Sequence, residues 1–218
     1  MAGFKPILRI FLLLILAAHT GPSHAAILPA NGLLDFSVIR NGEKIGTHVL
    51  SFRQANNRID VDIQTRIAVK IAFITVYRFE HDGHEKWKDG KLVRMETKTN
   101  DDGTDHTLQV SADGAHKLHV VSDGRESEIA PDMVPASLWN PAFIRTHELM
   151  DSLVGTPLNI KIADKGEETV DVRGKPVQAH HYSMTGDLAR ELWYDDKGIL
   201  VRMALTGKDG TNVDYVLR

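Results

Sequence analysis

The chain has no cysteine among its 218 residues. This absence excludes disulfide bonds, thiol chemistry and an acyl anchor attached to a lipobox cysteine. The unbroken apolar run from Ile10 to Ala18 is too short to span a bilayer, and no later segment is long and apolar enough to do so. We therefore expect no transmembrane segment in the mature chain.

Several motifs of catalysis and cofactor binding are also missing. The sequence contains no G-x-S-x-G, no P-loop and no G-x-G-x-x-G, so we expect no nucleotide or dinucleotide cofactor. His84-Glu85 and His147-Glu148 begin like a zinc-protease motif, but neither has a second histidine four residues later. A zinc protease of that type is excluded.

The first 25 residues have the pattern of a secretory signal peptide. Lys5 and Arg9 precede the apolar run, and Ser23-His24-Ala25 forms a small-x-small cleavage site. We predict an exported, soluble protein whose mature chain spans 26–218, periplasmic in a Gram-negative source. That mature chain carries 24 Lys and Arg against 29 Asp and Glu, and this acidity argues against a nucleic-acid partner.

The most informative feature present is a segment that occurs twice, over 85–95 and 191–203. E-x-W-x-D, L-V-R-M and a following D-G-T recur in the same order in both copies. Each copy is typical of a β-hairpin with an Asp/Gly turn, because strand residues flank the turn on both sides. The predicted cross-strand pairs are Trp87 with Leu92, Glu85 with Arg94, Trp193 with Leu200 and Glu191 with Arg202.

The rest of the mature chain also indicates antiparallel β structure. Turn signals such as Asn41-Gly42 recur about every ten residues, and apolar residues alternate from Ile59 to His81. We predict a bend or bulge between Ala68 and Phe73. A further turn at Asp82-Gly83 would place Tyr77 opposite Trp87, as an aromatic pair.

One stretch, Pro131 to Leu153, lacks this pattern and predicts a crossover with a short helix over Ala142–Met150. It separates two β-rich halves, 26–130 and 154–218. We predict one domain that is all-β with one short helix. Its core would be a single antiparallel, strongly curved sheet or incomplete β-barrel of about 10–12 strands, with the crossover over one mouth or one face.

Such a sheet leaves an apolar concavity, which is the usual place for a small ligand. The leading hypothesis is a binding or carrier module for an apolar or amphipathic molecule such as a lipid. Four aromatic side chains would line its site, with an arginine at the polar head group. The predicted ligand-binding residues are Tyr77, Phe79, Trp87, Trp139, and Arg94 or Arg202.

Two other hypotheses stay open. The cluster Glu80–Glu85 places two imidazoles within six residues of three carboxylates, and such groups suit zinc. It predicts a metal-assisted hydrolase centred on His81, His84 and Glu85, although solvated turn residues would give the same pattern. The other hypothesis is an envelope structural or interaction protein that adds a partner strand at an exposed sheet edge.

Five segments resemble a bacterial family of exported proteins that carries a domain-of-unknown-function label. They are Asn41–His48, Val76–His81, Glu85-x-Trp87, Thr99–Gly103 and Leu192–Asp195. The resemblance covers nearly all of the mature chain. It implies a β-rich exported domain and assigns no activity. The W-x-D turn followed by a strand with arginine is also similar to that of periplasmic half-barrels that carry lipids or lipoproteins.

Overall fold

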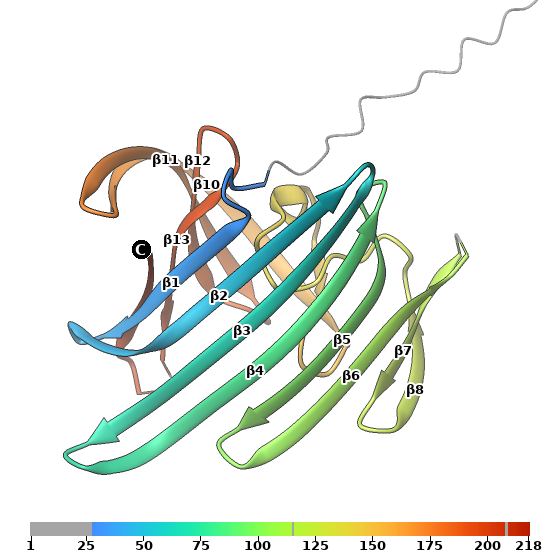
Figure 1. Cartoon of the computed structure of the whole chain (residues 1–218), viewed down its shortest axis with the longest axis horizontal. Helices are drawn as coiled ribbons and strands as arrows, with labels where there is room; N and C mark the ends of the chain where they lie inside the picture. Colours follow the sequence, from blue (N-terminus) through green and yellow to red (C-terminus); the bar gives the residue numbers. More distant parts are fainter. Residues whose placement is uncertain (1–27, 115, 208) are drawn as a thin grey trace, which may run out of the picture.

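A computed structural model describes residues 28–114, 116–207 and 209–218, so the predicted signal peptide lies outside the described residues. The described part forms fourteen strands and one short 3-10 helix, η1. All fourteen strands belong to one sheet, and neighbouring strands are antiparallel (Figure 1). No helix in this part of the chain is long and apolar enough to cross a membrane.

The first half of the chain supplies eight strands in sequential order. They are β1 (Leu33–Arg40), β2 (Glu43–Ala55), β3 (Arg58–Ile71), β4 (Ile74–Lys88), β5 (Lys91–Asp101), β6 (Thr104–Asp113), β7 (Lys117–Ser122) and β8 (Arg125–Ile129). The second half supplies six. They are β9 (Glu148–Met150), β10 (Pro157–Val172), β11 (Lys175–Gly186), β12 (Arg190–Asp195), β13 (Leu200–Thr206) and β14 (Asn212–Leu217).

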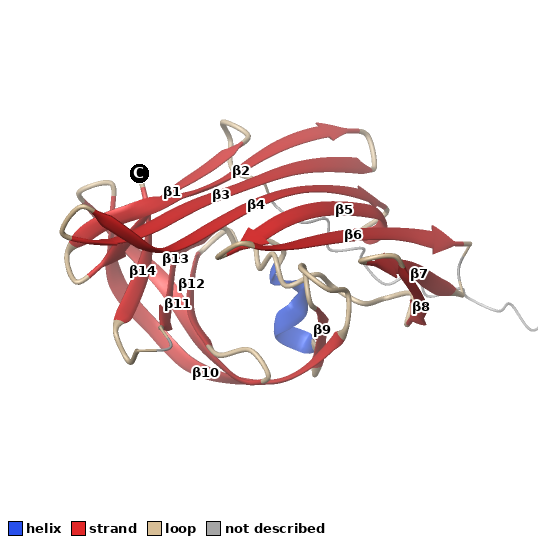
Figure 2. Cartoon of the chain, turned by 90° about the horizontal axis from the view of Figure 1, so that it is seen from below, coloured by secondary structure: helices blue, strands red, loops and turns tan. Residues whose placement is uncertain are grey.

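The two halves form one continuous sheet because the last strand, β14, pairs with the first, β1. The sheet is not closed into a barrel: β8 and β9 are its two edges. Figure 2 shows β10 curving beneath the layer formed by β1 to β6, with η1 between them. The predicted all-β, curved antiparallel fold is confirmed, with fourteen strands in the described residues where ten to twelve were expected.

Tight turns explain why the strands follow one another so regularly. Five two-residue turns place both central residues at positive φ, a conformation that Asn or Asp followed by Gly adopts readily. These turns join β1 to β2, β4 to β5, β5 to β6, β7 to β8 and β10 to β11. Their residues are Asn41-Gly42, Asp89-Gly90, Asp102-Gly103, Asp123-Gly124 and Arg173-Gly174.

The turn predicted at Asp82-Gly83 is wrong, because Gly83 lies inside β4, opposite Ile63. A Cβ at Gly83 would lie 3.1 Å from Nε2 of His81, so this glycine makes room for an imidazole. The chain instead reverses after Ile71, close to the predicted bend. Tyr77 consequently pairs with Val69 and does not face Trp87.

The hairpin registers of the two copies are partly as predicted. Trp87 faces Leu92, but a bulge follows, so Arg94 faces Lys86 and Glu85 faces Met95. The bulge, which inserts one unpaired residue, is the reason that the predicted Glu85–Arg94 pair is wrong.

In the second copy both predicted pairs are wrong. Leu200 faces Tyr194, Arg202 faces Trp193, and Ala204 faces Glu191. The loop Asp195 to Ile199 is one residue longer than expected, and this shifts the opposing strand by one position.

The crossover between the halves contains less helix than predicted. Helix η1 spans Pro141–Arg145, and the side chain of Asn140 caps it by accepting a hydrogen bond from the backbone N–H of Ala142 at 3.0 Å. The predicted helix to Met150 is wrong because Glu148–Met150 form β9 and pair with β10. That pairing gives their backbone groups the partners that a longer helix would have provided.

Candidate functional site

At one end of the concave face the interior is filled by the protein's own side chains. Trp139, on the crossover, packs edge-on against Trp87 and Phe52, with ring centroids 5.4 Å and 5.3 Å apart. The hydroxyl of Tyr194 donates a hydrogen bond to the carbonyl oxygen of Leu138 at 2.5 Å and ties the crossover to β12. This end has no room for a ligand beside the crossover.

A fully buried carboxylate, Glu85, lies at the centre of this packing. Its Oε2 accepts hydrogen bonds from the indole N–H groups of Trp87 at 2.8 Å and Trp139 at 2.9 Å. Oε1 has no partner of good geometry within the described residues, although the hydroxyl of Ser137 lies close to the carboxylate. Burial raises the pKa of Glu85, and the two indoles and Ser137 offset part of that rise.

Next to this packed end lies a band of two buried histidines, one on β2 and one on β4. Nδ1 of His48 lies 2.8 Å from Oγ1 of Thr65, and Nδ1 of His81 lies 2.7 Å from Oγ1 of Thr99. Burial lowers the pKa of each imidazole to about 4, and His81 adds to the shift of His48. Both side chains are therefore neutral at neutral pH.

The other end of the concave face is hollow. A cavity of about 550 Å³ lies between β2, β3 and β4 on one side and β12, β13 and β14 on the other. This volume falls within the range of small-molecule sites, roughly 300–1,000 Å³. Most of the wall is apolar, from Ile45, Ile67, Val69, Ile71, Val76, Phe79, Leu205 and Val213.

Two arginines reach this cavity, and their surroundings differ. Arg40 forms an ion pair with Asp209, and its Nε donates a hydrogen bond to Oγ1 of Thr211 at 3.0 Å. Arg190 forms no ion pair within the described residues; its Nη1 donates only to the carbonyl oxygen of Ala189, at 2.7 Å. Burial lowers the pKa of Arg190, which nevertheless remains a cation at neutral pH.

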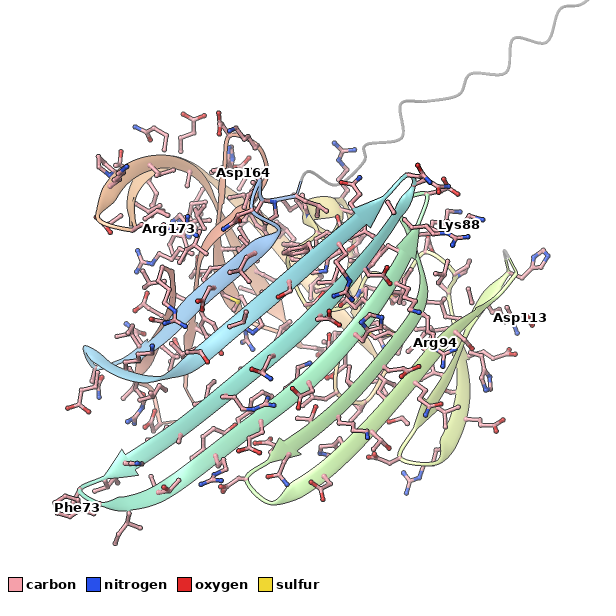
Figure 3. The ribbon with its side chains drawn as sticks, in the orientation of Figure 1. Phe73, Lys88, Arg94, Asp113, Asp164 and Arg173 are labelled. Carbon is pink, nitrogen blue, oxygen red and sulfur yellow. The ribbon has the colours of Figure 1, made fainter. Side chains whose placement is uncertain are left out.

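The rim of the cavity continues into an exposed apolar tip. The end of the β3–β4 hairpin carries four large apolar side chains that face solvent, and Phe73 is completely exposed. Figure 3 shows Phe73 at the projecting end of that hairpin. Ile71 and Val76 belong both to this tip and to the cavity wall, so the two apolar surfaces are continuous.

The structure separates the aromatic residues that the sequence grouped into one site. Tyr77 and Phe79 line the cavity, and the Tyr77 hydroxyl donates a hydrogen bond to Oδ1 of Asp101 at 2.9 Å. Trp87 and Trp139 lie together in the packed end, with the two histidines between them and Phe79 along β4.

Neither arginine predicted to meet a head group lines the cavity. Arg94 is exposed and pairs with Glu96 on its own strand. Arg202 pairs with Asp214 at 2.6 Å, and its guanidinium carbon lies 4.6 Å from the centroid of the Trp193 ring. Arg190, the arginine that does line the cavity, is missing from the predicted set.

The three predicted metal ligands are not brought together. His81 and Glu85 point to the concave side, whereas His84 is on the opposite face of β4 and pairs with Asp62 at 2.7 Å. This separation follows from the alternation of a continuous strand, since even and odd positions face opposite sides. Within the described residues no group of three or more His, Cys, Asp or Glu could hold a metal ion.

Comparisons with known proteins agree with this architecture. Residues 36–218 match the model of a family described as Domain of unknown function (DUF6134). The chain belongs to that family. A comparison with curated proteins gives no match.

A solved structure shares the fold. It is titled a crystal structure of a beta-barrel-like protein of domain of unknown function DUF1849 from Brucella abortus. The two chains align with a TM-score of 0.60 at 11% identity, over 85% of this chain and 94% of that chain. The family and this neighbour both support a β-barrel-like antiparallel sheet, and neither title states an activity.

The sequence does contain a signal for the arginine that was missed. Arg190, Leu192 and Tyr194 occupy alternate positions of one strand, and Leu192 and Tyr194 are buried on the concave side. Alternation places Arg190 on that same face. The wall residues Ile67, Val69 and Ile71 were recognised as one buried face by the same alternation.

Proposed function

We propose that this protein is an exported carrier or binding module for an apolar or amphipathic small molecule such as a lipid. The observation that supports this most is the apolar cavity of about 550 Å³ within a curved sheet whose other end is filled by the crossover. A ligand there would remove apolar wall and its own chain from water, at roughly 25 cal/mol per Å² of apolar surface.

The exposed tip gives this cavity a route to a lipid surface. Monomeric proteins rarely leave several large apolar side chains together in water, and such patches commonly mark contact with a protein or a membrane. Because Ile71 and Val76 join the tip to the cavity wall, a bilayer touching the tip would also touch the cavity mouth. We propose that the ligand enters along this path.

The other two hypotheses receive less support from the described residues. A hydrolase centred on His81, His84 and Glu85 would need His84 on the concave face, and it lies on the other one. Addition of a partner strand would use the edge strand β8, whose exposed residues include Arg125, Glu126 and Glu128. Charged side chains on an edge strand discourage such pairing.

Binding is tested by measuring what the purified protein carries and takes up. The full-length precursor is expressed, and the protein is recovered from the periplasmic fraction, which also tests export. Its organic extract is analysed by mass spectrometry, and uptake of a fluorescent fatty acid is titrated. We expect lipid in the extract and saturable uptake.

A matched pair of variants ties the uptake to the cavity. Ile67→Trp adds bulk to the cavity wall, and Gln109→Trp adds the same side chain to the exposed outer face of β6. We expect Ile67→Trp to weaken uptake at least tenfold and Gln109→Trp to leave it unchanged. The proposal fails if the extract holds no lipid and neither variant changes uptake.

A further inference from the structure

The cavity holds two polar groups that have no use in the structure as it stands. Arg190 lacks an acidic partner within the described residues, as already noted. The Tyr215 hydroxyl, on the same wall, likewise has no hydrogen-bond partner there, although the side chain is largely buried. Arg190 is close enough to Tyr215 to offset part of the rise that burial causes in the pKa of that phenol.

This arrangement is specific to Arg190, because the neighbouring cation in the cavity is already neutralised. Arg40 is held by Asp209 and Thr211, so it has few free donors for a ligand. A cation in apolar surroundings is costly unless it is paired. An unpaired guanidinium beside a free phenol in an apolar cavity therefore fits a ligand that brings its own negative charge.

We propose that the ligand is an amphiphile with an anionic head, and that Arg190 binds the head while the apolar wall takes its chain. The planar guanidinium matches carboxylate and phosphate oxygens with two parallel hydrogen bonds, and the Tyr215 hydroxyl supplies a third donor. The chain lies against the wall formed by β3 and β4, across the cavity from β12. This inference rests on the proposed function and narrows it to one class of ligand.

The position of Arg190 explains how the sequence builds this head-group site. Arg190 opens β12 and pairs with Met184 of β11, so its side chain shares the concave face with Leu192. Gly186, just before β12, has a φ of 113° and is packed against the carbonyl oxygen of Asn159. A side chain at that position would displace the backbone of β10, so the glycine fixes the bend that leads into Arg190.

The test compares ligands that share a chain and differ in the head. A fatty acid, an alkyl phosphate, a fatty alcohol and an alkylammonium of equal chain length are titrated by displacement of a fluorescent probe. The wild-type protein should bind the acid or the phosphate at least tenfold more tightly than the alcohol, and the ammonium most weakly. The stronger of the two anions identifies the source of the negative charge.

Variants assign the preference to one residue. Arg190→Gln should lower affinity for the preferred anion by about tenfold to a hundredfold, as expected for loss of charged hydrogen bonds, and leave the alcohol unchanged. Arg94→Gln, which removes an exposed arginine outside the cavity, should change neither. Thermal unfolding of each variant checks that the fold is intact.

The possible failures are distinguishable. Equal affinity for acid and alcohol in the wild-type protein would overturn the anionic-head inference and leave the carrier proposal standing. A preference for the anion that survives Arg190→Gln would overturn the role of Arg190. Absence of binding by all four amphiphiles would contradict the carrier proposal itself.

Discussion

The two copies of the duplicated segment have the same second strand and different first strands. In both copies the leucine of L-V-R-M is paired, the valine is the unpaired residue of a bulge, and the arginine faces outward. In the first copy the leucine faces Trp87, whereas in the second it faces Tyr194, the residue after the tryptophan. A shift of one position has therefore turned the second tryptophan to the outer face.

That shift gives the same residues different work. Trp87 and Glu85 of the first copy are buried on the concave side and hold the crossover through Trp139. Trp193 of the second copy lies on the outer side, where His181 stacks on it with ring centroids 4.4 Å apart. Its indole N–H donates to Glu168, on the part of β10 that curls over this face. Loop length thus decides which side of a sheet a repeated motif serves.

The tryptophans should give the largest difference between the copies. Trp87→Ala would leave a cavity beside Trp139 and remove one of two donors to buried Glu85, so we expect the free energy of unfolding to fall by about 3–5 kcal/mol. Trp193→Ala removes a ring held between polar side chains, and we expect a loss of about 2 kcal/mol. Chemical denaturation of both variants measures this difference, and equal losses would show that the two sites are equivalent.

The glutamates should differ in the sign of their response to pH. Burial holds the pKa of Glu85 above its unfolded value, so the folded protein keeps a proton that the unfolded chain loses. The free energy of unfolding therefore falls as pH rises from the unfolded pKa through the folded one. Glu85→Gln cannot lose that proton, and we expect this variant to be more stable than wild type at pH 8 and to lack the decline.

The equivalent change in the second copy is the control. Glu191 accepts hydrogen bonds from Ser183 at 2.8 Å and contacts Nε2 of His181 at 2.7 Å. Glu191→Gln should lower the free energy of unfolding by about 1 kcal/mol at pH 8, because it replaces charged hydrogen bonds with neutral ones. A loss of stability in Glu85→Gln at that pH would mean that the buried carboxylate is ionised.

Local patterns predicted the fold better than the registers. Alternation over Ile59 to His81 and the repeated Asx-Gly turns were sufficient for an antiparallel curved sheet, because both depend only on neighbouring residues. Gly83 shows the limit of such signals. The sequence Asp-Gly is the same at a turn and in a strand, and here contact with His81 across the interior decides the outcome.

The site was less predictable because it depends on how the sheet curves. Tyr77, Phe79, Trp87 and Trp139 are all concave-facing, as expected, but only the folded sheet shows that the crossover fills one end and leaves the other hollow. The same holds for Arg190, which strand alternation places on the concave face. Its lack of an acidic partner follows from which strands lie across the cavity.

The arginines of the two L-V-R-M strands should give the smallest effects. Arg94 forms an exposed pair with Glu96, and such pairs contribute little, so Arg94→Gln should change the free energy of unfolding by less than about 0.5 kcal/mol. Arg202→Gln loses both the pair with Asp214 and the contact over Trp193, for which we expect about 1 kcal/mol. Combining Arg202→Gln with Trp193→Ala should cost less than the sum of the two, because the ring contact can be lost only once. Strict additivity in that double mutant would show that the arginine acts through Asp214 alone, and that the outward tryptophan owes its stability to His181 and the curled end of β10.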